Sequence, residues 1–304
     1  MGHHNHDHHH DHPHQEITSL NKVFIIGISL NIVFVAAEFL AGFWYNSLGL
    51  ISDAGHNLGD VASLVLAMLA FRLAKVNPTP NYTYGYKKST VLVSLLNAVI
   101  LLIAVGVIVA ESVGKLMHPR PVEGEAIAWV AGIGVVINAV TAWLFMKDKD
   151  KDLNVKGAYL HMAADTLVSV GVVVSGIVIS YTGWYVIDPI IGILIAIVIV
   201  ISTWGLLRDS IRLSLDGVPS GTDTVAVERG IRSVEGVCDI HHLHIWAIST
   251  TETALTVHVV IKDTSRMETI KSAIKERLLA CGVQHVTLEF ETTDAICDKN
   301  CSCG

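Results

Sequence analysis

Charged side chains are scarce in this chain of 304 residues. Only 16% of the residues are Asp, Glu, Lys or Arg, whereas 51% are hydrophobic and the mean hydropathy is +0.52. Such a composition is too apolar for a soluble globular protein and is typical of a chain embedded in a lipid bilayer. The formal net charge is −7 and no dense cluster of Lys and Arg occurs, which argues against nucleic acid as a partner.

Other absences narrow the function further. No nucleophile–base constellation or cofactor motif stands out, so the sequence does not predict an enzyme. The extreme N-terminus is rich in His and Asp rather than basic, and the first apolar run is long enough to span a membrane, so no cleaved signal peptide is expected. No cysteine precedes Cys238, and all five lie in a tail predicted to be cytoplasmic. There we expect reduced thiols or metal ligands rather than disulfides.

Six apolar segments of about twenty residues are each long enough to cross ~30 Å of hydrocarbon. They are residues 20–42, 49–74, 90–114, 123–146, 157–181 and 187–207. Lys and Arg occur in the second loop (Arg72, Lys75, Lys87, Lys88), the third (Lys115, Arg120) and the fourth (Lys147, Lys149, Lys151, Lys156), but not in the first or fifth. By the positive-inside rule, both termini of this predicted multi-pass protein are cytoplasmic. We expect a bacterial cell (inner) membrane, with an organelle membrane as the alternative.

The sequence predicts three regions. Residues 1–16 hold eight of the sixteen histidines and cannot build a core, so we expect a disordered cytoplasmic segment that captures metal loosely. A purification tag is the alternative for this irregular run. Residues 17–213 are predicted to form a six-helix transmembrane domain, and residues 214–304 a cytoplasmic regulatory domain with a Cys-rich tail.

Two His-x3-Asp pairs, His56 with Asp60 and His161 with Asp165, lie inside apolar segments. Each pair places an imidazole and a carboxylate on one helix face, roughly 6 Å apart along the axis. Two such helices side by side would form a site of two nitrogens and two oxygens, which suits tetrahedral Zn²⁺. A lone ionisable group near the bilayer centre costs ~3 kcal/mol or more. A functional site therefore explains four ionisable residues within the apolar segments better than polar groups at helix ends would.

The tail has the pattern of a small α+β domain. Residues 222–233 and 266–280 are predicted helices, and 237–248, 254–261 and 285–291 are predicted strands. The order αββαβ predicts a ferredoxin-like sheet with its helices on one face. Together with the apolar segments, it makes the fold class an α-helical membrane protein with a C-terminal cytoplasmic α+β domain.

Alternation of apolar and polar residues predicts a second metal site on this sheet. It places His258, Glu289 and Glu291 on the side opposite the apolar face. A histidine from the first strand could join them, but apolar residues there occupy both registers, so His241, His242 and His244 all stay open. Ordinary polarity of a surface strand is the alternative reading. Further along the tail, Cys297, Cys301 and Cys303 have the character of metal ligands without a standard finger spacing, and either bind metal or have no such role.

Three stretches resemble the cation diffusion facilitator family of divalent-metal transporters. They are residues 52–60 (SDAGHNLGD), 82–88 (YTYGYKK) and 161–165 (HMAAD), and the resemblance extends over nearly the whole chain. It implies a homodimer, formed through the transmembrane and C-terminal domains, that exports cytoplasmic Zn²⁺ in exchange for protons. In this family His at the first motif position is associated with zinc preference, so His56 points to Zn²⁺, with Co²⁺ or Cd²⁺ as lesser substrates.

The resemblance also implies two features outside the transport site. It carries over the tail site as His241, His258, Glu289 and Glu291, and a charge interlock as Lys88 with Asp216. Two other functions compete with antiport: a passive divalent-metal channel, and a membrane-anchored zinc sensor or storage protein. Four strong ligands converging on one ion argue against a channel, which needs weak sites. A sensor would not need ligands in two transmembrane helices.

Overall fold

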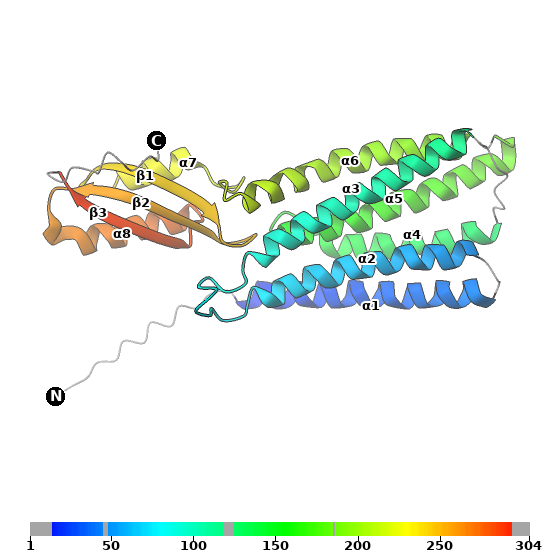
Figure 1. The fold of residues 1–304 in the computed structure, drawn as a ribbon, viewed down its shortest axis with the longest axis horizontal. Helices are drawn as coiled ribbons and strands as arrows, with labels where there is room; N and C mark the ends of the chain where they lie inside the picture. The colour runs from blue at the N-terminus through cyan, green and yellow to red at the C-terminus, as the bar shows by residue number, and fades with distance from the viewer. Residues whose placement is uncertain (1–13, 45–47, 118–124, 185, 294–304) are drawn as a thin grey trace, which may run out of the picture.

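The computed structural model describes residues 14–44, 48–117, 125–184 and 186–293. A bundle of long helices and a smaller α+β domain lie end to end along the long axis (Figure 1). The bundle helices are α1 (His14–Trp44), α2 (Leu48–Leu73), α3 (Ser89–Met117), α4 (Glu125–Met146), α5 (Leu153–Thr182) and α6 (Ile187–Ser214).

The bundle is built from apolar helices because a helix satisfies its own backbone hydrogen bonds, as hydrocarbon requires. Its interior contains Phe24, Phe145 and Met162, which are fully buried between helices, whereas large side chains such as Phe43 and Trp143 are exposed on its outside. Among the described residues, three helices are long and apolar enough to cross a membrane: Lys22–Leu40, Ser89–Met117 and Pro189–Ser214. The exposed apolar surface fits a lipid environment.

Helix α5 lies centrally in the bundle. It packs against α4 and α6 and also contacts α2 and α3, while α1 pairs with α2 and α3 with α6. One interhelical contact is the hydrogen bond between the Ser94 and Ser210 hydroxyls of α3 and α6, at 2.8 Å. Since α2 and α5 are neighbours, the two helices that carry the His-x3-Asp pairs lie side by side.

Some helix ends differ from the predicted spans. Helix α1 begins at His14, so residues 14–16 are helical rather than part of a disordered segment. The earlier residues, 1–13, lie outside the described part of the chain. Helix α6 continues past residue 207 to Ser214, because Ser210 and Leu213 remain buried against neighbouring elements. Hydropathy locates the apolar span, and the helix extends beyond it into the polar region.

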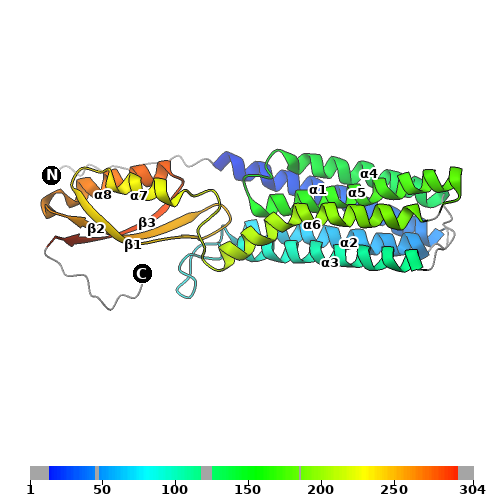
Figure 2. The same ribbon diagram turned by 90° about the horizontal axis from the view of Figure 1, so that it is seen from above.

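The second domain confirms the αββαβ order. Its elements are α7 (Thr224–Arg232), β1 (Val237–Ala247), β2 (Thr253–Ile261), α8 (Met267–Ala280) and β3 (His285–Thr292), with a 3-10 turn at Thr264–Arg266 before α8. The strand order is β1-β2-β3, with β1 antiparallel and β3 parallel to β2. Both helices cover one face of the sheet (Figure 2).

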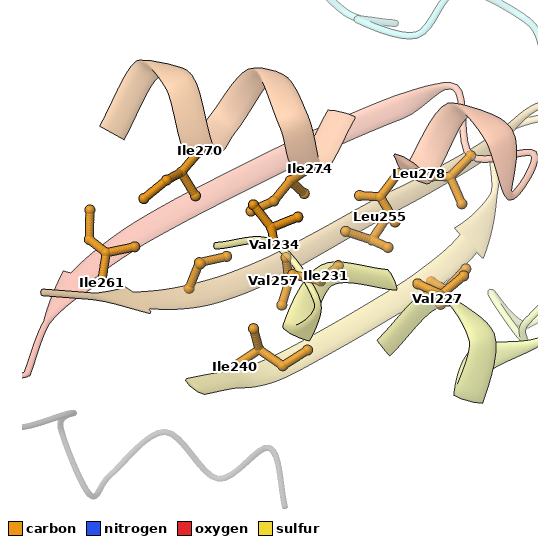
Figure 3. Packing of buried hydrophobic residues seen from close by; sticks show 13 residues of the cluster. Val227, Ile231, Val234, Ile240, Leu255, Val257, Ile261, Ile270, Ile274 and Leu278 are labelled. Carbon is orange, nitrogen blue, oxygen red and sulfur yellow. The ribbon is translucent and has the colours of Figure 1, made fainter. Parts of the chain in front are cut away.

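The core of this domain lies between the two helices and the sheet. Ile231 of α7 and Ile274 of α8 are fully buried there against Leu255 and Val257 of β2 (Figure 3). Residues 255, 257, 259 and 261 of β2 are buried and the residues between them are only partly so, as the alternation predicted. The opposite face of the sheet is therefore left for polar side chains.

Candidate metal centres

The first candidate centre lies inside the helical bundle, where Asp60 of α2 meets His161 and Asp165 of α5. His161 Nε2 is 2.6 Å from Asp60 Oδ1 and 3.8 Å from Asp165 Oδ2. One ligand atom from each residue lies within 4.8 Å of the others. Asp60 is 2% exposed and His161 is 5% exposed. The structure thus brings together three of the four residues that the paired motifs predicted.

The fourth predicted ligand is His56. Its backbone belongs to α2, one turn before Asp60, but its side chain lies outside the described residues. The four-ligand site therefore stays a prediction, supported by the position of His56 on the same helix as Asp60.

The geometry of the three described residues suits a small tetrahedral cation. Ligand atoms about 2.0–2.2 Å from a tetrahedral Zn²⁺ lie roughly 3.3 Å from each other. The two His161 distances, 2.6 and 3.8 Å, fall on either side of that value, so shifts of less than about 1 Å would suffice. In addition, the buried Oδ2 atom of Asp60 has no hydrogen-bond partner among the described residues. A bound cation would satisfy it.

A buried hydrogen bond joins α1 to α2 three residues before Asp60, and its two partners could not be paired from the sequence. Asn57 Nδ2 of α2 donates to Glu38 Oε2 of α1 at 2.6 Å, and both side chains are buried. Glu38 is thus an interhelical hydrogen-bonding residue, as polar residues in membrane helices commonly are. The bond fixes α2 against α1 one residue after His56. The only available signal was the position of two polar residues in apolar segments, which does not identify partners.

The second candidate centre lies on the open face of the sheet, where each of the three strands contributes a side chain. His258 Nδ1 of β2 is 2.7 Å from Glu291 Oε1 of β3, and His258 Nε2 is 3.3 Å from Glu289 Oε2. His241 Nε2 of β1 is buried 3.3 Å from Glu291 Oε2 without forming a hydrogen bond. All four residues predicted for the tail site therefore meet, and His241, His258 and Glu291 form a set that could hold a metal ion.

The backbone of β1 explains why periodicity left its histidines unresolved. The register of β1 against β2 shifts between His241 and His244, and His242 has a φ of 50°. This bulge lets two consecutive rings approach His258: the ring centroid of His241 is 5.1 Å away and that of His242 is 5.0 Å away. His244, two residues after His242, is exposed and pairs with Thr256 instead.

The electrostatics of this cluster favour an ionised Glu291. Burial alone raises the pKa of Glu291, but the hydrogen bond with His258 and the proximity of His241 and His258 outweigh burial and bring the pKa below its ordinary value. An ionised carboxylate between two imidazoles is a ligand set that Zn²⁺ accepts.

Cys297, Cys301 and Cys303 lie outside the described residues, so their role stays a prediction. In the described part of the chain, Cys238 and Cys281 are free thiols. The charge interlock implied by the resemblance is present, because Lys88 Nζ lies 2.6 Å from Asp216 Oδ1.

Comparison with known proteins relates most of the chain to metal transporters. The family model described as "Cation efflux transmembrane domain" matches residues 24–213, and the one described as "Cation efflux protein, cytoplasmic domain" matches residues 219–292. The chain is 36% identical over 276 residues to the "Cadmium, cobalt and zinc/H(+)-K(+) antiporter" of Bacillus subtilis (strain 168), covering 89% of each chain.

Two further relatives have similar names. The "Zinc transporter ZitB" of Escherichia coli (strain K12) is 32% identical over 291 residues, which cover 95% of this chain and 92% of the relative. The "Metal cation efflux system protein CzcD" of Cupriavidus metallidurans is 36% identical over 269 residues, which cover 88% of this chain and 85% of the relative. All three printed names describe the transport or efflux of metal cations.

Proposed function

This chain belongs to the cation efflux family, the cation diffusion facilitators, and from that premise we propose that it exports Zn²⁺ from the cytoplasm in exchange for protons. The observation that carries the proposal is the buried convergence of Asp60, His161 and Asp165 between α2 and α5. We include His56 as the fourth ligand of a His₂Asp₂ transport site. The names of the relatives, which include zinc transport and H⁺ antiport, support the substrate and the counter-ion.

Competition between metal and protons for the same side chains is sufficient for antiport. His56 and His161 bind a metal only when neutral, and Asp60 and Asp165 only when ionised. When the site faces the cytoplasm, Zn²⁺ displaces protons; when it faces outward, protons weaken the ligand set and the metal leaves. The helices need only avoid opening both sides at once, as alternating access requires.

The ligand types set the substrate preference. Imidazole together with carboxylate suits Zn²⁺, and Co²⁺ or Cd²⁺ would be lesser substrates. Mg²⁺ should be rejected, because it gives up water reluctantly and prefers octahedral oxygen. A site closed by four protein ligands leaves no open coordination position for chemistry, so we propose a transporter and not an enzyme.

The cytoplasmic cluster extends the proposal to regulation. We propose that His241, His258, Glu289 and Glu291 bind Zn²⁺ when its cytoplasmic concentration is high, and that this adjusts transport by a homodimer. This is supported by the separations between the imidazole nitrogens and the carboxylate oxygens, which are 2.7 to 3.3 Å across the three strands. In this arrangement the protein is a multi-pass protein of a bacterial inner membrane with both termini in the cytoplasm.

Proteoliposomes that contain a pH-sensitive dye test the proposal. A zinc gradient should drive protons in the opposite direction in the wild type, whereas Asp60→Ala should abolish both fluxes and His258→Ala should only reduce them. Zinc flux without proton movement would indicate a passive channel instead. Normal flux from Asp60→Ala would contradict the assignment of the transport site, and the absence of flux from the wild type would favour a sensor.

A further inference from the structure

The cytoplasmic domain touches the helical bundle through the loop that joins β1 to β2, residues 248–252, which we term the hairpin loop. Figure 1 shows that the end of β1 and the start of β2 face the bundle. The loop is held rigid by Ser249, whose Oγ accepts hydrogen bonds from the backbone N–H groups of Thr251 and Glu252 at 3.1 and 2.9 Å. It therefore presents a fixed surface to the helices.

Asp152, the residue before α5, is the centre of this contact. Its Oδ1 accepts hydrogen bonds from the backbone N–H groups of Asn154 at 2.6 Å and Val155 at 3.3 Å, so it caps the first turn of α5. Its Oδ2 accepts a hydrogen bond from the hydroxyl of Thr250 in the hairpin loop. One buried carboxylate thus binds both the start of α5 and the cytoplasmic domain.

Helix α3 closes the same network. Thr90 Oγ1 accepts a hydrogen bond from the backbone N–H of Thr250 at 3.1 Å, and the Thr90 carbonyl accepts one from Asn154 Nδ2 at 3.0 Å. Thr90, Asp152 and Asn154 are all buried. The hairpin loop, α3 and the start of α5 each take part in two of these three hydrogen bonds. A displacement of the hairpin loop therefore strains its hydrogen bonds to both α3 and the start of α5.

Packing and ion pairs surround the network. Ala247, just before the hairpin loop, packs with Val91 of α3 and Leu213 of α6. At the same end, Lys88 Nζ donates to the Ala247 carbonyl at 3.0 Å. At the other end of the loop, Glu252 forms an ion pair with Lys87 Nζ at 2.6 Å. The loop is therefore seated among three helices.

The position of α5 matters because this helix supplies two of the described ligand residues. Leu153, at its start, lies only about 12 Å along the axis from His161 at 1.5 Å per residue. A continuous helix over this length transmits a displacement of its first turn to His161 and Asp165. Asp60 stands on a different helix, so the same displacement changes the geometry between the ligands.

We propose that Asp152 is a positioning residue for zinc transport, which holds α5 through the hydrogen bond that it accepts from Thr250 of the hairpin loop. This inference rests on the proposed transport function. It also gives the tail site a route to the transport site, because His241 and His258 stand on the two strands that the hairpin loop connects.

Two pairs of variants test the contact from both of its sides. Thr250→Val removes the hydroxyl but keeps the side-chain shape and the cap of α5. Thr251→Val is its control, because it also removes a hydroxyl of the hairpin loop, but one whose partner, Ser249, belongs to the loop and not to the bundle. Asp152→Ala removes the cap of α5 and the contact with Thr250. In Asp152→Asn the side-chain oxygen can still accept from the N–H groups of the first turn, and the side-chain amide can donate to the Thr250 hydroxyl. Burial raises the pKa of Asp152, against the opposing effect of its hydrogen bonds, so burial disfavours the charge, and Asp152→Asn tests the hydrogen bonds without that charge.

The readout is the kcat and KM of zinc transport in proteoliposomes. We expect Thr250→Val and Asp152→Ala to lower kcat by about fivefold or more, the lower end of usual coupling between sites, and to raise KM as well, because the displacement of α5 changes the geometry between the ligands. Asp152→Asn and Thr251→Val should behave as the wild type. The double variant with both Thr250→Val and Asp152→Ala should be no worse than the more affected single variant, because the two residues act through one contact.

A second readout does not depend on transport. Hydrogen exchange of the backbone amides in the first turn of α5 should become faster in Thr250→Val and stay unchanged in Thr251→Val. Wild-type kcat and unchanged exchange in Thr250→Val would overturn the inference. If the wild type itself moves no zinc, the proposed function fails, and the exchange measurement still decides whether the hairpin loop positions α5.

Discussion

Replacement of Asp60 by asparagine changes one oxygen of the intramembrane centre into an amide and leaves the side-chain size unchanged. In the structure Asp60 Oδ1 is 2.6 Å from His161 Nε2, and its other oxygen is buried without a hydrogen-bond partner among the described residues. An amide removes the negative charge that a divalent cation requires. It can still form a hydrogen bond with His161, so the contact between α2 and α5 is retained while a proposed metal ligand is lost.

The expected loss of affinity is large. Four-ligand Zn²⁺ sites in small proteins bind with about 10–16 kcal/mol, so one ligand of four corresponds to roughly 3 kcal/mol. A factor of ten in Kd is about 1.4 kcal/mol, and Asp60→Asn should therefore weaken zinc binding by about 100-fold or more. The other ligands of the centre are unchanged, so weak binding should remain.

Equilibrium zinc binding to the purified protein measures this loss. The comparison is made in a His258→Ala background, so that the cytoplasmic site does not obscure the intramembrane one. Ser210→Ala is the matched control, because Ser210 is also a fully buried polar residue of the bundle but its hydroxyl is bonded to Ser94 of α3 and not to a candidate ligand. Wild-type affinity in Asp60→Asn, or an equal loss in Ser210→Ala, would refute the assignment of Asp60 as a ligand.

Two other substitutions test the cytoplasmic domain. The pKa of Glu291 lies below its ordinary 4.5 in the metal-free fold, so its contribution to stability is present above pH 4.5 and is lost as the pH falls through the lowered pKa. Glu291→Gln should flatten that acid dependence of thermal unfolding, and an unchanged profile would contradict it. Ile274→Ala should lower the free energy of opening of the β2 amides by about 2–5 kcal/mol in native-state hydrogen exchange. Leu279→Ala, on the exposed side of α8, should change it by less than about 0.5 kcal/mol, and equal effects would refute the core assignment.

Hydropathy and alternation were sufficient for the elements of both domains. The apolar run 90–114 corresponds to α3 at Ser89–Met117, and the predicted strand 254–261 to β2 at Thr253–Ile261. Spacing alone also predicted that His161 and Asp165 share a helix face. These successes have one physical cause, since each feature depends on residues close together in sequence and on a regular period.

Features that depend on local irregularity or on distant partners were not predictable. The register shift after His241 places two neighbouring rings near His258, and a strict period of two cannot produce that result. The hydrogen bond between Thr250 and Asp152 joins residues that are 98 positions apart. No pattern in the sequence relates these two residues, because their meeting follows from the placement of the whole cytoplasmic domain against the bundle.

The most direct test of antiport through the intramembrane site is zinc uptake into proteoliposomes with and without an imposed pH gradient, for the wild type and Asp165→Ala. Because protons and metal compete for the same ligands, wild-type uptake should increase when protons can leave the vesicle in exchange. Asp165→Ala should lose this gradient-driven uptake. Equal uptake by both proteins under every gradient would contradict the intramembrane site and direct attention to the cytoplasmic histidines.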